Sequence, residues 1–134
     1  MPLALATVNT STDSQQPTAR SVRVGFLGPF GTFTEQAVRS QSDLGSGELV
    51  AFRSVPDVLD AVDNADVDFG VVPIENSIEG TVNFTQDALS FDYNLLIQRE
   101  LVLDIEHCLM AMPGTSLADI TTVLSIPVAT AQCH

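Results

Sequence analysis

Short apolar runs alternate with polar or amphipathic stretches along most of the chain, and this alternation predicts its elements. Three runs have the length and composition of buried strands, namely residues 22–27, 49–52 and 69–74. A polar or amphipathic segment follows each of them. Three strand-helix alternations within about 70 residues predict an α/β fold with a largely parallel sheet.

Capping residues mark the predicted helix starts. Thr32 and Glu35 stand in a capping-box pattern, which predicts a helix to about Gln41. Ser54 precedes a segment in which apolar residues recur at helical spacing while aspartates occupy the opposite face, which predicts a second helix. Further helices are predicted over residues 82–89 and from Pro127, which stands where proline favours helix entry.

Two regions depart from this alternation. Residues 1–21 are rich in Ser, Thr, Gln and Pro and show no sustained periodicity, so we predict a disordered leader there. Residues 95–112 form a long, mostly apolar stretch, which predicts one extended strand or two strands in line, and a strand of that length often passes between two lobes. Residues 116–120 are predicted to form a short helix, and residues 122–125 a strand.

Composition and charge narrow the classes of partner. The chain has 134 residues, 45% of them hydrophobic, which suffices to bury roughly two-thirds of the unfolded surface. Seventeen acidic residues against five basic ones, all Arg, give a formal net charge of -12 at pH 7. Such sparse, scattered cations argue against nucleic acid and against anionic membrane surfaces. An anionic metabolite stays possible, because local N–H donors can override the mean charge.

The same composition bears on compartment and metals. No stretch approaches the roughly 18 to 20 apolar residues of a membrane span, and the N-terminus lacks the features of a secretory signal. Cys108 and Cys133 stand 25 residues apart without a Cys-x-x-Cys pair, which argues against a zinc site or a disulfide framework. We therefore expect a cytoplasmic protein without a metal.

Candidate chemistry gathers where predicted strands end and helices begin, because free N–H groups at helix N-termini attract anions. Three junctions fit this description, namely residues 28–32, 73–77 and 125–132. The first lacks the Gly-Lys-Ser/Thr ending of a P-loop and the glycine spacing of a Rossmann fold. Its glycines are equally compatible with a tight turn that binds nothing.

Glu75 and Asn76 are the most informative polar residues. A carboxyl group directly after an apolar strand is expected to be partly desolvated, which suits it to protonate or hold a hydroxyl. Asn76 beside it offers a donor and an acceptor together. The alternative is that both residues only cap a helix or turn. His107 is interpreted as a core histidine, and Glu75 with Glu79 lacks the His partners of a metal site.

Four blocks of the sequence together resemble prephenate dehydratase, the enzyme of phenylalanine biosynthesis. They are Gly28-Pro29-Phe30-Gly31-Thr32-Phe33-Thr34 with Ala37, Val72-Pro73-Ile74-Glu75-Asn76-Ser77-Ile78-Glu79-Gly80, Ile105-Glu106-His107-Cys108-Leu109, and Ser125-Ile126-Pro127 with Ala131-Gln132-Cys133. The blocks occur in the family's order and cover nearly everything from Val22 onward. The Val-Pro-Ile-Glu-Asn-Ser block is the most specific of them.

The resemblance implies a two-lobed α/β fold similar to type II periplasmic binding proteins, with the active site between the lobes. It implies a lyase that converts the dicarboxylate prephenate to phenylpyruvate, carbon dioxide and water without a metal or an organic cofactor. Carried over position by position, Glu75 becomes the catalytic candidate that orients or protonates the leaving hydroxyl. The substrate-binding candidates are Gly31, Thr32, Asn76, Ser125 and Gln132. Ile126 stands where many members carry His, so we assign it no role.

The resemblance also marks family features without a counterpart here. The Thr-Arg motif, whose threonine is regarded as the key catalytic hydroxyl, does not occur before His134. The strands that return to the first lobe and the regulatory ACT domain are likewise without a counterpart. We therefore expect residues 22–100 to form a first lobe and residues 101–134 to begin a second, incomplete lobe. On this interpretation the chain is an N-terminal portion of the enzyme, inactive by itself and part of a homo-oligomer when full length.

Two alternatives stay open. The chain could be a non-catalytic module that binds a small carboxylate in its cleft without transforming it. It could also belong to an arogenate dehydratase, which acts on the aminated analogue of prephenate.

Overall fold

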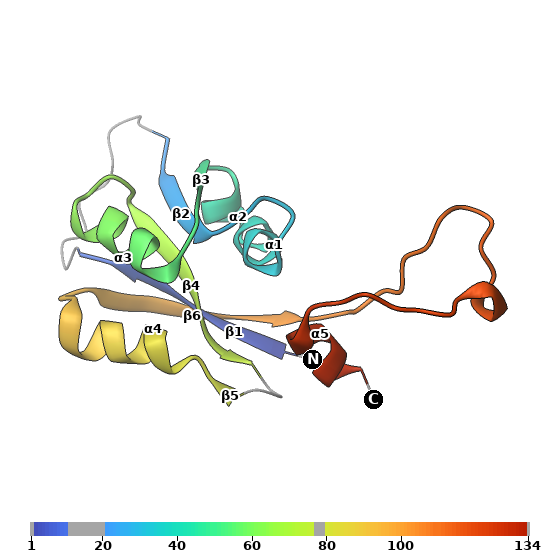
Figure 1. Cartoon of the computed structure of the whole chain (residues 1–134). Helices are drawn as coiled ribbons and strands as arrows, with labels where there is room; N and C mark the ends of the chain where they lie inside the picture. The colour runs from blue at the N-terminus through green and yellow to red at the C-terminus, as the bar shows by residue number, and fades with distance from the viewer. Residues whose placement is uncertain (1, 11–20, 77–79, 134) are drawn as a thin grey trace.

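The computed structural model describes residues 2–10, 21–76 and 80–133, which form a β-sheet with helices packed on it and an irregular arm that leaves it (Figure 1). The strands are β1 (Pro2–Asn9), β2 (Arg23–Leu27), β3 (Glu48–Phe52), β4 (Phe69–Asn76), β5 (Gly80–Thr81) and β6 (Leu96–Asp104). The helices are α1 (Phe33–Ser40), α2 (Ser42–Gly45), α3 (Val55–Asp63), α4 (Asn83–Asp87), which runs into a π-helical turn (Ala88–Asp92), and α5 (Pro127–Gln132). None of the helices in these ranges is long and apolar enough to cross a membrane.

The sheet is mixed, with the strand order β3-β2-β4-β1-β6 and with β5 paired to β4. β2 is parallel to both β3 and β4, as the strand-helix alternation predicts. β1 is antiparallel to β4 on one side and to β6 on the other, and β5 is antiparallel to β4. The prediction of a largely parallel sheet is therefore wrong for its second half, because β1 enters between two strands that run in the same direction.

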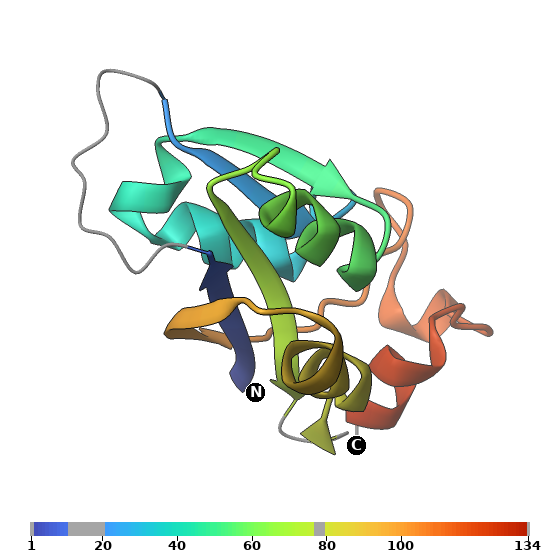
Figure 2. The same cartoon turned by 90° about the vertical axis from the view of Figure 1, so that its left-hand side faces the viewer.

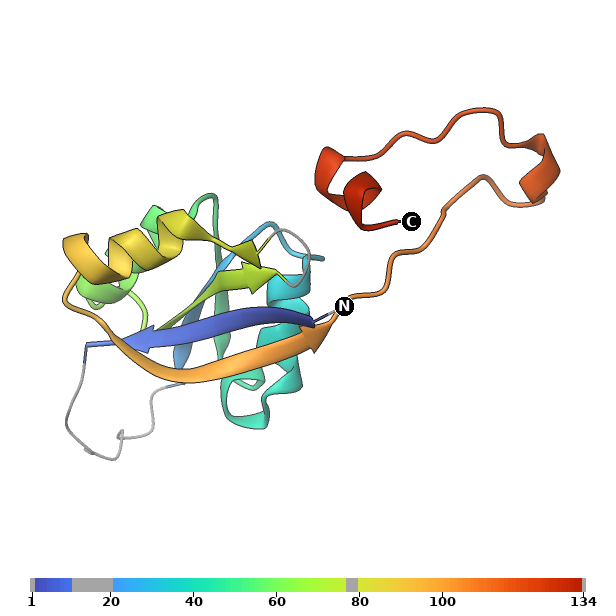
Figure 3. The same ribbon diagram turned by 90° about the horizontal axis from the view of Figure 1, so that it is seen from below.

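β1 overturns the prediction of a disordered leader for part of residues 1–21. Its residues are hydrogen-bonded to strands on both sides, and Thr7 and Val8 are buried (Figure 3). The polar composition of that region is concentrated in residues 10–21, whereas residues 2–8 are apolar apart from Thr7. The composition averaged over residues 1–21 is polar, and this average concealed the short apolar strand at its start. The prediction of disorder for residues 11–20 lies outside the described residues.

The core consists of two apolar layers, one on each face of the sheet. Neighbouring residues of β4 enter different layers, since Val71 belongs to one and Val72 to the other, as strand geometry requires. The layer with Val72 contains the apolar face of α3, and the layer with Val71 contains residues of α1 and α2. Helices thus cover both faces, and α1 and α3 lie on opposite sides of β4 (Figure 2).

The predicted helix caps are confirmed at α1 and α3. The Thr32 side chain accepts a hydrogen bond from the Glu35 N–H, and the Ser54 side chain accepts one from the Asp57 N–H. α1 ends at Ser40, close to the predicted end. Each side-chain oxygen satisfies an N–H group that has no partner within its helix, which fixes where the helix begins.

The arm, residues 105–133, contains less regular structure than its sequence predicts. β6 continues through the predicted lobe boundary at residue 100 and stays in the sheet to Asp104, but residues 105–112 are not a strand. The predicted strand at 122–125 is also irregular, whereas a 3-10 turn (Leu117–Asp119) and α5 occupy the predicted helical positions. An apolar strand needs a paired neighbour, and the described arm provides none for these segments.

Candidate active site at the carboxyl edge of the parallel strands

The candidate site lies at one edge of the sheet. β2 and β4 are adjacent and parallel, so their carboxyl ends reach the same edge, which is where α/β folds bind ligands. β2 leads into the turn at residues 28–32 and then into α1, while β4 ends at Glu75 and Asn76. Four of the six predicted site residues, namely Gly31, Thr32, Glu75 and Asn76, therefore come from this edge.

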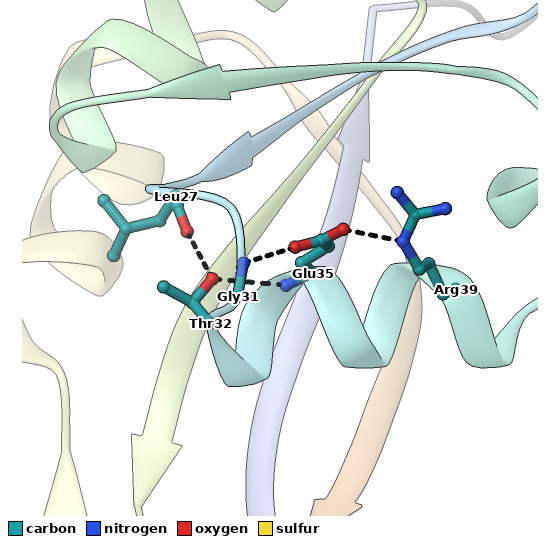
Figure 4. Close-up of polar contacts among 5 residues, drawn as sticks. All are labelled: Leu27, Gly31, Thr32, Glu35 and Arg39. Carbon is teal, nitrogen blue, oxygen red and sulfur yellow. Dashed lines mark hydrogen bonds and ion pairs between the residues drawn. The ribbon is translucent and has the colours of Figure 1, made fainter.

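The turn between β2 and α1 is held by the Thr32 hydroxyl (Figure 4). Oγ1 of Thr32 donates to the Leu27 carbonyl at 3.3 Å and accepts from the Glu35 N–H at 3.4 Å. Gly31 has a φ of 89°, which favours glycine because a Cβ is strained there. The predicted tight turn therefore leads directly into the predicted helix N-terminus. The Thr32 hydroxyl links the two, because it bonds both the end of β2 and the first turn of α1.

Glu35 places a carboxylate at this helix N-terminus (Figure 4). The Gly31 N–H donates to its Oε2 at 2.5 Å, and Nε of Arg39 donates to its Oε1 at 2.7 Å. The hydrogen bond from Gly31, followed by that from Arg39, holds the pKa of the Glu35 carboxyl below its usual range. In a capping box the glutamate would reach back to the N-cap N–H, but here it bonds the residue before it. The Gly31 N–H, a predicted substrate donor, therefore already binds a carboxylate of its own chain.

Glu75 and Asn76 are the last two residues of β4, with strands on both sides. Their partners are Ala4 and Leu3 in β1, and Thr81 and Gly80 in β5. The Glu75 side chain is exposed, so the predicted partial desolvation is wrong: the buried core residues of β4 are Val71 and Val72, and Glu75 lies beyond them near the end of the strand. Both residues are in a strand rather than at a helix start, and Val82 is the N-cap of α4, so they do not cap that helix. The predicted pairing with Glu79 lies outside the described residues.

The other two predicted residues lie in the arm. Ser125 is exposed and lines a cavity of about 870 Å³ formed by the arm itself, whose lining includes none of Gly31, Thr32, Glu75 and Asn76. Gln132 is the last residue of α5, and its side chain lies outside what the structure describes. Gly31, Thr32, Glu75 and Asn76 thus lie toward the same end of the sheet, with Glu75 and Asn76 beyond the last pair of β2 and β4, which is Phe26 with Val71, and Ser125 lines a separate cavity in the arm.

His107 corrects another prediction. It is exposed rather than buried in a core, and its ring meets Phe33 of α1 edge to face, with centroids 6.2 Å apart. The interpretation of a core histidine depended on a strand continuing past Asp104, and the strand ends there.

Sequence reasoning missed Arg53. It directly follows β3, the strand next to β2, and lines a cavity of about 330 Å³ together with the turn residues Gly28, Pro29 and Phe30. Three other arginines form ion pairs, which are Arg23 with Glu48, Arg39 with Glu35 and Arg99 with Asp43. Within the described ranges Arg53 has no ion pair and is exposed. The sequence did contain a signal for Arg53, because this residue stands between a predicted apolar strand and Ser54, the predicted cap of the next helix.

The described residues have an α/β fold similar to that of type II periplasmic binding proteins, in agreement with the predicted fold class. The family model of prephenate dehydratase matches residues 24–134, and the chain belongs to that family.

Relatives and solved structures agree with this assignment. The chain is 44% identical over 119 residues to a prephenate dehydratase of Mycolicibacterium gilvum, covering 81% of this chain and 38% of the relative. It is 41% identical over 115 residues to that of Bacillus subtilis, covering 84% and 40%. The chain thus spans about two-fifths of the length of these relatives, 38% and 40%.

The crystal structure of a prephenate dehydratase from Streptococcus mutans matches with a TM-score of 0.52 at 28% identity, covering 64% of this chain and 50% of that one. A structure of Tv2483 bound to L-arginine matches with a TM-score of 0.50 at 15% identity, covering 75% and 40%, which is a likeness of fold alone.

Proposed function

We propose that this chain forms the first part of the catalytic domain of a prephenate dehydratase, which converts prephenate to phenylpyruvate, carbon dioxide and water in phenylalanine biosynthesis. The observation that carries the proposal is the Val-Pro-Ile-Glu-Asn block at the end of β4, on the same sheet edge as the turn capped by Thr32. The family assignment supports the same reaction.

The reaction is a decarboxylation coupled to loss of a ring hydroxyl. The bond between the ring and its carboxylate breaks, its electron pair enters the ring, and the hydroxyl departs with a proton as water. The new aromatic ring supplies much of the driving force. The protein therefore has to hold two carboxylates and a carbonyl, and it has to deliver one proton.

Glu75 is suited to deliver that proton or to orient the departing hydroxyl. Its backbone is paired with β1 and β5 and its side chain is exposed, so the carboxyl group is anchored by the sheet and accessible to a ligand. Asn76 follows it and supplies an amide that can donate and accept. Ser125 and Gln132 would contribute further hydrogen bonds from the second lobe.

A substrate carboxylate needs positive charge in a chain with a net charge of -12. Arg53 and the N–H groups at the start of α1 supply it at the sheet edge, and Glu35 already shows that a carboxylate fits one of those N–H groups. A substrate carboxylate that takes the Gly31 N–H would have to displace Glu35, which keeps its second partner in Arg39.

The test compares the chain alone with a chimera in which residues 24–134 replace the matching segment of the Bacillus subtilis relative. We expect the chain alone to form no phenylpyruvate from prephenate and the chimera to form it at a measurable rate. A folded chimera that binds prephenate without turnover would favour the non-catalytic module. Assaying the chimera with arogenate as well separates the two substrates, and turnover by the isolated chain would contradict its being incomplete.

A further inference from the structure

Arg53 lies at a small cavity beside the turn that leads into α1. The cavity, of about 330 Å³, is lined by Gly28, Pro29, Phe30, Ala51, Phe52 and Arg53. Apart from Arg53 these residues are apolar or glycine, and none of them carries an acidic side chain. A ligand in this cavity would therefore meet one positive charge beside an apolar surface.

Direct contact between β3 and the turn fixes the shape of this cavity. The Gly28 N–H donates to the Phe52 carbonyl at 2.8 Å. A Cβ added to Gly28 would come within 2.9 Å of the Ala51 Cβ, so the turn approaches the strand more closely than a side chain would allow. The ring of Phe30 packs edge to face on the buried Phe26, with centroids 5.3 Å apart, yet Phe30 is 56% exposed. The cavity is thus bounded by anchored backbone and by an exposed aromatic ring.

The local charge at the cavity is positive. Among the described residues Arg53 forms no ion pair. Both oxygens of Glu35, the carboxylate that bonds the adjacent turn, are taken by the Gly31 N–H and by Arg39. An anionic ligand is therefore favoured at Arg53, although the whole chain has a net charge of -12.

The distance between this cavity and Glu75 suits the substrate. Ala51 and Val71 are level with each other, because both are paired with Phe26 of β2. Arg53 lies two residues beyond Ala51, and Glu75 lies four beyond Val71. With strands roughly 4.8 Å apart and a rise of roughly 3.3 Å per residue, the two backbones are roughly 12 Å apart. Two side chains and a six-membered ring can span that distance.

The substrate has its polar groups at matching ends. In prephenate the leaving hydroxyl and the keto acid side chain stand at opposite ends of the ring. A molecule whose hydroxyl meets Glu75 can therefore extend its keto acid side chain to Arg53. The exposed ring of Phe30 offers an apolar surface to the part between them.

A guanidinium group distinguishes a keto acid from an amino acid. It can donate two hydrogen bonds to the carboxylate and a further one to the adjacent keto oxygen. An ammonium group on the same carbon cannot accept a hydrogen bond, and the positive charge of the guanidinium repels it. The residues that line the cavity offer this ammonium no carboxylate. Prephenate and arogenate differ at this carbon alone, since prephenate carries the keto oxygen and arogenate the ammonium.

We propose that Arg53 binds the keto acid side chain of the substrate and selects prephenate over arogenate. This inference rests on the proposed function and deepens it, because it assigns one of the two substrate carboxylates to the cavity beside β3. The Gly31 N–H, now held by Glu35, is left for the other carboxylate. Loss of Arg53 favours arogenate, because the repulsion disappears and the net negative charge of the chain attracts an ammonium.

The first test introduces Arg53→Gln into the chimera. The matched control is Arg99→Gln, which removes the same charge from β6, at the opposite edge of the sheet from β3. For Arg53→Gln, the kcat/KM for prephenate divided by that for arogenate should fall at least about fivefold, as expected from one repulsion between unit charges at about 4 Å in water. For Arg99→Gln this ratio should change by less than about twofold, because a distant exposed charge is screened. An unchanged ratio for Arg53→Gln, or an equal fall in both variants, overturns the proposal.

A second test does not require turnover and decides the matter if the chimera is inactive. Phenylpyruvate and phenylalanine differ by the same keto and ammonium groups, and each is titrated into the 134-residue chain while NMR follows the amide signals of Gly28 and Phe30. Phenylpyruvate should bind at least about fivefold more tightly than phenylalanine, and Arg53→Gln should remove this difference. An inactive chimera with this difference contradicts the proposed function and leaves the selectivity of Arg53 standing. Equal binding of the two compounds, or no binding of phenylpyruvate, overturns that selectivity.

Discussion

The sheet body, which ends at Asp104, and the arm that follows it contain similar apolar side chains in opposite environments. Phe26, Val58 and Val72 are fully buried between sheet and helices. In the arm, Met110 is 88% exposed and Leu124 is 92% exposed. The body has strands that pair and helices that cover them, whereas the arm has apolar residues with neither. An apolar segment therefore becomes a strand or part of the core only where another strand pairs with its backbone or another element packs against its side chains.

The largest expected difference between the two regions is in core truncation. Phe26→Ala should lower the free energy of unfolding by about 3 to 5 kcal/mol, because it removes a buried ring from the layer packed on α1. Leu124→Ala in the arm should change it by less than about 0.5 kcal/mol. Urea unfolding of both variants measures this, and a large loss for Leu124→Ala would mean that the arm is packed in solution.

The next difference concerns the site in the chimera. Glu75→Gln should lower kcat by more than about tenfold, as expected when a proton donor is lost, and should leave the unfolding free energy nearly unchanged because the side chain is exposed. Ser125→Ala, in the arm, should instead raise the KM for prephenate with a smaller effect on kcat. Steady-state kinetics with both variants gives the two constants. An unchanged kcat for Glu75→Gln would show that Glu75 takes no part in the proton transfer and has only a structural role.

Helix caps give a smaller contrast. Thr32→Ala should destabilise the body by about 1 kcal/mol, because the hydroxyl satisfies the Glu35 N–H and also bonds the Leu27 carbonyl. Ser116→Ala removes the corresponding cap of the exposed 3-10 turn in the arm, and no measurable change is expected there. Thermal unfolding of both variants makes the comparison. Equal effects would show that the turn in the arm is coupled to the folded body.

The smallest expected effect belongs to Tyr93, the chain's single tyrosine. Its hydroxyl donates to Asp60 at 2.7 Å, and this hydrogen bond, aided by desolvation, raises the pKa of Tyr93 from 10.0 to about 12. The raised pKa means that this bond stabilises the fold fully below pH 10 and that the contribution is lost as the pH rises through about 12. Near-ultraviolet absorbance should show a midpoint near 12 in the folded chain and near 10 in urea. Asp60→Asn should bring the folded midpoint down toward the value in urea.

Much of the body could be predicted because its signals are local. The apolar runs that became β2, β3 and β4, and the caps Thr32 and Ser54, depend on neighbours within a few residues. The prediction of strands failed where a segment remote in the sequence decides whether a strand forms. β1 is a strand because β4 and β6 lie on either side of it, and residues 105–112 are not a strand because the described residues offer them no such neighbour.

The site divides in the same way. The residue types at positions 31, 32, 75 and 76 identified the sheet edge from sequence, because the ends of parallel strands meet there. The contact between Glu35 and Gly31 and the position of Arg53 beside the turn were not visible, since each depends on how α1 and β3 are placed against β2. The position of Glu75 within a strand was not visible either, since β4 continues to Asn76, two residues past the predicted end at residue 74.

The sequence by itself determined the family, the α/β class and the residues at the candidate edge, because these rest on motifs and on short-range periodicity. Only the tertiary structure decided that residues 2–9 complete the sheet, that the sheet is mixed, and which carboxylate occupies the start of α1. The physical reason is that backbone hydrogen bonds between strands join residues remote in sequence, so their pairing is set by what the folded chain brings alongside.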